Sequence, residues 1–244
     1  MSARRTLATA RRIIRQLRRD PRTVALLFVT PVILVALVKW VFDGRPGVFQ
    51  RVGVPLLGVF PLISMFLVTS IAMLRERTSG TLERLMTTPI SRVDLLGGYA
   101  IAFGVMATAQ ATIVSLIAFG LLDLQIEGPV ALVILMAVLN SLLGMALGLF
   151  LSAFASSEFQ AVQFMPAVMF PQLLLCGLLA PRGEMAGPLE WASTILPMTY
   201  AYDALERVAR DDVGGRLAID ALIVAVVTVT ALLLSAATLR RRTA

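Results

Sequence analysis

Long uncharged runs of about 20 to 30 residues dominate the chain. A helix needs roughly 20 apolar residues to cross the hydrocarbon core of a bilayer. Membrane-spanning segments form helices or closed barrels, and barrel strands are alternating segments of about ten residues, unlike these continuous runs. The pattern therefore predicts an all-α polytopic membrane protein, with residues 1–244 as a single transmembrane domain. Six transmembrane helices are predicted at about residues 23–42, 52–74, 95–122, 129–155, 160–181 and 217–239.

Composition agrees with this pattern. The chain is 58% hydrophobic and 15% charged, whereas a typical soluble domain is about 25% charged. It has no His and a single Cys. These absences exclude His-dependent general-base catalysis, His-based zinc sites and an intramolecular disulfide. An intramembrane enzyme is therefore the least supported class of function.

Basic residues gather on one predicted side of the membrane. The stretch up to Arg22, the segment 75–92 and the C-terminal tail contain eight, four and three Arg respectively. Arg and Lys near span ends are retained on the cytoplasmic side. We therefore expect a multi-pass protein of the bacterial plasma membrane with both termini in the cytoplasm, as an even number of spans also requires.

The N-terminal stretch predicts an amphipathic helix. Its apolar residues recur at helical spacing, and arginines occupy much of the rest. The apolar stripe is Leu7, Ala10, Ile13, Ile14 and Leu17. We expect this helix to lie on the cytoplasmic leaflet with its arginines near anionic head groups. The alternative is a solvated basic tail that only fixes topology.

Two segments outside the predicted spans also favour helix. After Ser79 and Gly80, plausible N-terminal caps, a short helix with an apolar ridge ends at Pro89. It either rests on the membrane surface or docks a cytoplasmic partner. On the outer side, residues 191–202 are uncharged but too short to cross. We expect re-entrant or interfacial helices between the fifth and sixth spans.

The loop between the second and third spans carries the most specific pattern. Its residues are Glu76, Arg77, Gly80, Thr81, Leu82, Glu83, Leu85, Thr88, Pro89, Ile90, Ser91 and Arg92. They match the pattern E-R-x-x-G-T-L-E-x-L-x-x-T-P-[IV]-S-R. In this pattern the chain resembles the type-2 permeases of ATP-binding-cassette (ABC) exporters, which have it in the same loop. Later elements of the family are matched by Gly177, Pro181, Pro197, Thr199, Tyr200, Ala201 and Arg207. The chain is most similar to short bacterial permeases of drug and antibiotic export.

This resemblance implies that the loop helix is a coupling helix docking on an ABC ATPase subunit. The implied coupling residues are Glu76, Arg77, Gly80, Thr81, Leu82, Glu83, Leu85, Met86 and Pro89. The chain lacks a G-x-x-x-x-G-K-[ST] phosphate loop. We therefore expect a transport subunit that binds no cofactor of its own, with ATP and Mg used by two copies of the partner ATPase. A second permease half, identical or paralogous, membrane lipids and a hydrophobic substrate are the other expected partners, and nucleic acid is not.

The resemblance also implies that the second and fifth spans line the substrate pathway. The candidates are Phe60, Ser64, Phe66, Gln160, Gln163, Phe164, Phe170 and Gln172. Amide and aromatic groups without fixed charge suit a hydrophobic or amphiphilic compound. Each Gln could equally form an interhelical hydrogen bond.

Small residues recur at every fourth position of the fourth span, including Gly144 and Gly148. This stripe favours tight helix packing over substrate contact. An ion-gradient-driven transporter and a non-transporting scaffold are alternative functions. The first is disfavoured because Asp220 alone among the acidic residues lies near a span interior.

Overall fold

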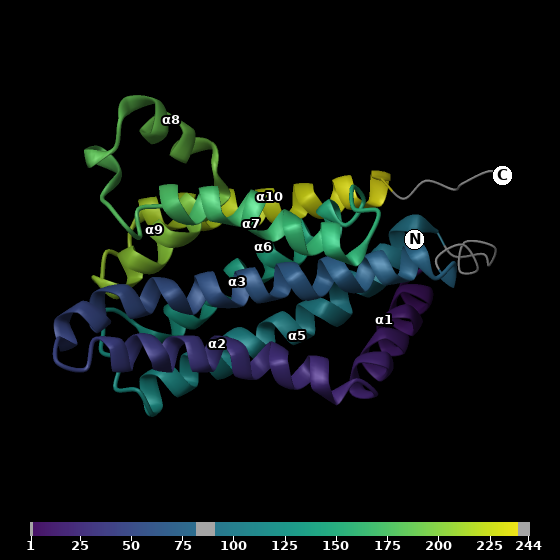
Figure 1. Cartoon of the computed structure of the whole chain (residues 1–244), viewed down its shortest axis with the longest axis horizontal. Coiled ribbons are helices and arrows are strands. Elements are labelled where there is room, and N and C mark those ends of the chain that lie inside the picture. Colours follow the sequence, from purple (N-terminus) through teal and green to yellow (C-terminus); the bar gives the residue numbers. More distant parts are fainter. Residues whose placement is uncertain (1, 82–90, 239–244) are drawn as a thin grey trace.

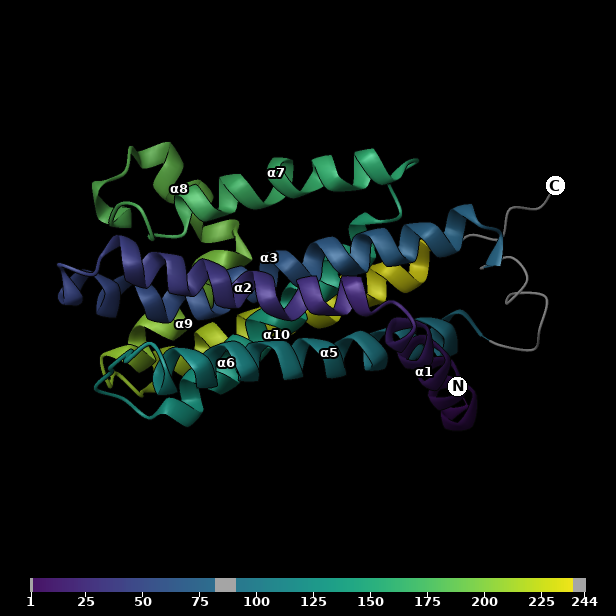
Figure 2. The ribbon, with the colours of Figure 1, turned by 60° about the horizontal axis from the view of Figure 1, so that its bottom comes forward.

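The structure, a computed structural model, describes residues 2–81 and 91–238. This part of the chain is helical and contains no strand, which confirms the predicted all-α fold. The long helices are α2 (Pro21–Val41), α3 (Pro46–Thr78), α5 (Arg92–Gly120), α6 (Val130–Leu151), α7 (Glu158–Leu175) and α10 (Gly215–Thr238). They run along the long axis of the molecule (Figures 1 and 2). The shorter elements are α1 (Ala3–Arg18), α8 (Gly187–Ile195), α9 (Pro197–Ala209) and the 3-10 helix η1 (Arg182–Glu184).

The two ends of the bundle differ. Helix α1 crosses one end, where the N-terminus and the end of α10 also lie (Figure 1). Helices α8 and α9 lie at the opposite end. They form the predicted helical excursion, and neither helix, at 9 and 13 residues, is long enough to span a bilayer.

Among the described residues, five helices are long and apolar enough to cross a membrane: α2, α3, α5, α6 and α10. Helix α7 runs beside them in both views (Figures 1 and 2) but is not one of the five. Its 18 residues reach about 27 Å and include three Gln and two Pro. The sixth crossing therefore stays a prediction.

Two predicted spans are shorter than the uncharged runs suggest. The predicted fourth span reaches residue 155, but α6 ends at Leu151. The hydroxyl of Ser152 then donates to the carbonyl of Leu149 at 2.6 Å, and this local bond competes with helix continuation. The predicted fifth span reaches residue 181, but α7 ends at Leu175 and Gly177 turns the chain at φ +105°. Charge alone does not mark these ends because the turns are uncharged.

The contact between α3 and α6 depends on glycine. A Cβ atom added at Gly144 would lie 2.1 Å from the carbonyl oxygen of Leu62, and one at Gly148 would lie 2.4 Å from that of Phe66. The two backbones therefore touch. The interpretation of this stripe as a packing surface is confirmed.

Helix α1 is present as predicted, but its apolar stripe does not simply face lipid. Ala10 and Ile13 are buried in a core cluster with residues of α3 and α5, whereas Leu7 is 63% exposed. Gly98 of α5 permits this packing, since a Cβ there would lie 2.5 Å from Cβ of Thr9. Helix α1 is therefore docked on the bundle through these residues, and its position on the cytoplasmic leaflet stays a prediction.

A buried side-chain amide replaces a missing backbone hydrogen bond in α2. Pro31 lies inside this helix and has no N–H for the carbonyl of Leu27, four residues earlier. The side-chain nitrogen of Gln110 in α5 donates to that carbonyl at 2.6 Å and to the hydroxyl of Ser64 in α3 at 2.6 Å. One amide thus joins three helices.

Candidate functional site

The last turns of α3, which lead into the motif loop, are held by α1. Glu76 is 6% exposed. Its Oε1 accepts from Nη1 of Arg12 at 3.3 Å, and Nη2 of Arg12 donates to the hydroxyl of Tyr99 in α5 at 2.9 Å. Arg12 therefore points into the protein between α3 and α5, which corrects the expectation that the arginines of α1 all lie near head groups.

The other flank of the loop is also tied to α1. Ser91 and Asp94 form a capping box at the start of α5, in which the amide of Asp94 donates to the Ser91 hydroxyl at 3.0 Å. The amide of Ser2, next to α1, donates to Oδ1 of Asp94 at 2.8 Å. Glu76 and Asp94 thus bracket the loop, and both are bound to the N-terminal segment.

Between these flanks the described chain makes one sharp turn. Helix α3 ends at Thr78, and Ser79 is its C-terminal cap rather than an N-terminal one. Gly80 has φ +69°, a left-handed conformation that favours glycine. The hydroxyls of Ser79 and Thr81 are hydrogen-bonded at 3.0 Å. The docking ridge of the loop helix stays a prediction. Five predicted coupling residues lie outside the described residues: Leu82, Glu83, Leu85, Met86 and Pro89.

Two further arginines of α3 lie at this end. Arg75 donates to both carboxylate oxygens of Glu158, at 2.7 and 3.1 Å, and so ties α3 to the start of α7. Arg77 has buried Nε and Nη2 atoms without a hydrogen-bond partner among the described residues. A guanidinium in that state is costly unless another group meets it.

The predicted pathway residues do not share one surface in the single chain. Phe66 is fully buried, and Gln172, 5% exposed, donates to the carbonyl of Val168 in its own helix. Ser64 accepts from the side-chain amide of Gln110, and this bond joins α3 to α5. Gln160 accepts from the amide of Ser156 at 2.8 Å before α7.

The remaining candidates divide in the same way. Phe60 and Phe164 are partly buried against core clusters. Gln163 is exposed and Phe170 is 48% exposed on α7. Among the candidates on α7, Gln163 and Phe170 are thus the exposed ones, and the substrate pathway stays a prediction.

Sequence reasoning missed Arg12, Asp94 and Tyr99. The pair Ser91 and Asp94 has capping-box spacing and could have been found from that signal. Arg12 had no such signal, because it is one of several arginines in α1. In the part of the chain that the structure describes, no group of three or more His, Cys, Asp or Glu could hold a metal ion.

Fold and site together define a polytopic helical membrane protein whose N-terminal segment is bound to both flanks of the motif-bearing loop. The model of the family described as ABC-2 type transporter matches residues 4–208. The chain therefore belongs to the ABC-2 type transporter family.

Two relatives show the range of the similarity. The chain is 33% identical over 147 residues to ABC transporter G family member 20 of Dictyostelium discoideum. The aligned region covers 60% of this chain and 20% of that protein. It is 29% identical over 157 residues to the probable multidrug ABC transporter permease YbhR of Escherichia coli (strain K12). Here the aligned region covers 64% of this chain and 43% of that protein. The matched part is thus less than half the length of either relative.

Proposed function

We propose that the chain is the membrane-spanning half of an ATP-driven exporter that moves a hydrophobic or amphiphilic compound out of a bacterial cell. A separate ABC ATPase, using ATP and Mg, would dock on the loop that contains residues 80–89. The proposal is supported by family membership and by the loop motif. The name of the Escherichia coli relative, a probable multidrug permease, agrees with this substrate class.

The observation that carries the proposal is the bracketing of the loop. Arg12 binds Glu76 on one flank, and Ser2 binds Asp94 on the other. A force on the loop would therefore act on α1, α3 and α5 as a unit, because these contacts join the three helices. Coupling between distant sites requires such a connected and packed set of elements.

The exposed face of α7 is the proposed pathway surface. Gln163 and Phe170 offer an amide and an aromatic ring without a fixed charge, which suits a substrate that is itself largely apolar. A second permease half would cover this face and close the path between two copies. Identical or paralogous halves both satisfy this requirement.

An ion-gradient-driven transporter is less well supported. Its strongest candidate residue, Asp220, is 7% exposed and accepts from Nε of Arg207 at 2.9 Å. Arg207 already occupies an oxygen of this carboxylate, so a coupling cation would have to displace the guanidinium. Neither the geometry nor the family favours this alternative.

Reconstitution with a candidate partner ABC ATPase from the same genome tests the proposal. Inside-out proteoliposomes containing both proteins are expected to accumulate a fluorescent hydrophobic dye when ATP is added, also in the presence of ionophores. A Leu85→Asp variant in the predicted ridge should insert normally but lose ATPase stimulation and dye uptake. Leu121→Asp is the matched control, since it makes the same change at a 78% exposed position at the opposite end of α5. Dye uptake that survives replacement of residues 82–88 by a Gly-Ser linker would refute the coupling role, and uptake abolished by ionophores would favour the ion-driven alternative.

A further inference from the structure

A cavity of about 490 Å³ lies at the end of the bundle opposite the loop, where α3 begins and α7 has just ended. None of the proposed pathway residues lines it, and neither does any Asp or Glu of the described residues. The volume falls within the roughly 300–1,000 Å³ of small-molecule sites. Its apolar wall is formed by Val48, Val52, Leu178, Leu179 and Pro181.

The wall that follows α7 is fixed against α9. Gly177 turns the chain at φ +105°, and a Cβ atom added there would lie 3.3 Å from Cε1 of Tyr202. The next element, η1, is joined to α9 by the ion pair between Arg182 and Asp203. The cavity is therefore part of the packed fold and does not need a ligand to form.

Tyr202 offers the cavity a free donor. Only 7% of this residue is exposed, yet its hydroxyl is accessible and has no hydrogen-bond partner among the described residues. Burial raises the pKa of the hydroxyl to about 12, and the nearby charge of Arg51 acts in the opposite direction. The hydroxyl therefore keeps its proton at neutral pH and can donate it in a hydrogen bond.

Arg51 lines the same cavity and supplies a positive charge. It is exposed and forms no ion pair within the described part of the chain. On its other side it borders an open groove with Glu127 and Glu206. Glu206 is bound by Arg210 in that groove. The guanidinium of Arg51 is thus available to an incoming group.

The backbone adds further donors. Leu179 and Ala180 also line the cavity, and their amides donate to no carbonyl in the described part of the chain. A guanidinium, a phenol hydroxyl and unpaired amides favour an anion with several acceptor oxygens. The absence of a lining carboxylate removes the repulsion that such an anion would otherwise meet.

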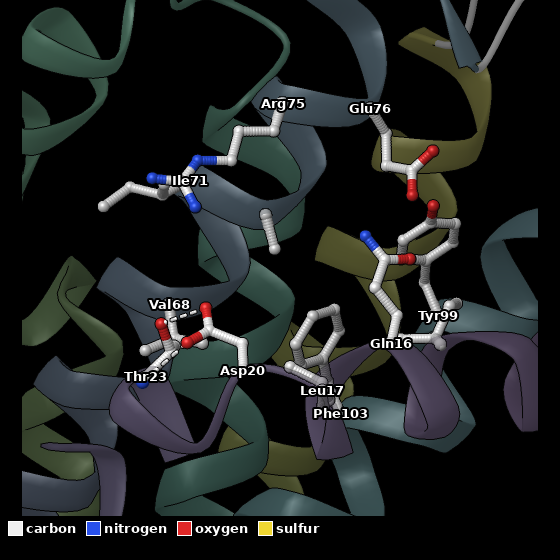
Figure 3. Close-up of a pocket in the computed structure, with 12 residues that line it drawn as sticks. Gln16, Leu17, Asp20, Thr23, Val68, Ile71, Arg75, Glu76, Tyr99 and Phe103 are labelled. Carbon is white, nitrogen blue, oxygen red and sulfur yellow. Dashed lines mark hydrogen bonds between the residues drawn. The ribbon is translucent and has the colours of Figure 1, made fainter. Parts of the chain in front are cut away.

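The cavity at the loop end of the bundle, about 210 Å³ in volume, differs in this respect (Figure 3). Asp20 there caps the start of α2. Glu76 accepts from Arg12, and Arg75 donates to Glu158. Because each of these charged groups already has a partner, we assign no ligand to that cavity.

We propose that the cavity between α3, α9 and the end of α7 binds an anionic amphiphile, whose acidic head group is bound by Arg51 and Tyr202. Its hydrocarbon chain lies against the apolar wall. Leu179 is 68% exposed, so this wall continues to the surface of the bundle, where an alkyl chain can enter. The site needs only the single chain and does not depend on the exporter proposal.

Photolabelling of the full chain in phosphatidylcholine nanodiscs tests the site. The probe is dodecyl phosphate with a diazirine in its chain, and labelled peptides are mapped by mass spectrometry. Labels are expected in residues 47–52 and 177–181. Dodecyl phosphate and laurate should compete with the probe, whereas dodecanol and dodecyltrimethylammonium should not. If dodecanol competes as well as dodecyl phosphate, the cavity is only an apolar gap and the proposal is wrong.

Variants locate the head group within the cavity. Arg51→Gln should weaken competition by dodecyl phosphate about tenfold, and Tyr202→Phe about threefold. Arg51→Lys keeps the charge and should retain most of the competition. Arg216→Gln is the matched control, because it removes the same charge at an exposed position of α10 outside the cavity.

Unchanged competition in a folded Arg51→Gln variant would overturn the assignment, and so would an equal loss in Arg216→Gln. The competition series uses the unmodified chain, so the proposal remains testable if a variant fails to fold.

An anionic amphiphile reaches the site either as an acidic membrane lipid or as a free compound. Native mass spectrometry of the chain released from nanodiscs of phosphatidylcholine and phosphatidylglycerol distinguishes these sources. Retained phosphatidylglycerol that is lost in Arg51→Gln supports the site with an acidic lipid as occupant. Competed probe labelling without retained phosphatidylglycerol supports it with a free anionic amphiphile as occupant.

Discussion

Arg12 in α1 and Glu76 in α3 form an ion pair of 3.3 Å although 64 positions separate them in the sequence. The same guanidinium donates to Tyr99 of α5. Three helices that meet at the loop are thereby held by one side chain. Loss of either partner leaves a charge in a largely buried place, which costs more than the pair itself contributes.

Glu76→Gln or Arg12→Gln should each destabilise the chain by about 1–3 kcal/mol. Both variants should also weaken stimulation of the partner ATPase, because α1 would no longer hold the flank of the loop. Thermal unfolding in detergent and ATPase assays of the reconstituted complex measure the two effects. Arg11→Gln, at an exposed position of α1, is the matched control. The double variant should lose less than the sum of the single losses, and full additivity would contradict the coupling of the pair.

Gln110→Leu should cost about 1–2 kcal/mol, because the carbonyl of Leu27 would lose its donor in a buried place. Pro31→Ala restores a backbone N–H four residues after Leu27 and should rescue much of that loss. Unfolding temperatures of the two single variants and the double variant measure this relationship. Equal losses for Gln110→Leu in the presence and absence of Pro31 would show that the amide does not act by replacing a helix bond.

Gly144→Ala and Gly148→Ala should each destabilise the chain by about 1–3 kcal/mol. The added methyl groups would meet backbone oxygens of α3, which cannot move away as a side chain could. Gly104→Ala is the matched control, since its Cβ would lie at an ordinary 3.5 Å from Leu142. Chemical or thermal unfolding in detergent checks the difference. If Gly104→Ala destabilised the chain as much as Gly148→Ala, the cause would be helix flexibility and not the contact between α3 and α6.

Acid should stabilise the end of the bundle that carries α9. Burial raises the pKa of Asp203 from its ordinary 3.8 to about 6, although Arg182 donates to it. The folded chain therefore holds this proton where the unfolded chain has lost it, and stability contributed here falls as pH rises from about 4 to 6. The effect is of the order of 2–3 kcal/mol.

Comparison of the natural chain with Asp203→Asn isolates this titration. The unfolding temperature of the natural chain should fall relative to that of the variant between pH 4.5 and pH 7, because Asn cannot lose a proton. Other carboxyl groups contribute equally to both proteins. Parallel pH profiles would show that Asp203 titrates as it does in water.

Much of the architecture follows from local sequence. The long helices lie where uncharged runs exceed the length of a bilayer crossing. The small residues Gly144 and Gly148 predict a close contact between helices. Both depend on short-range patterns that a neighbouring helix does not change. The loop motif likewise predicted the family correctly, because its residues are close together in the sequence. The ends of α6 and α7 were missed, since turns at Ser152 and Gly177 contain no charge to mark them.

The sequence by itself determined a membrane chain of long apolar helices with a basic amphipathic helix and a motif-bearing loop. Only the tertiary structure decided which polar groups meet. It selected Arg12 from the arginines of α1, paired Asp220 with Arg207, and placed Gln110 against the carbonyl left free by Pro31. These partners lie on different helices, and the crossing geometry that brings them within hydrogen-bond distance is set by packing, not by spacing along the chain.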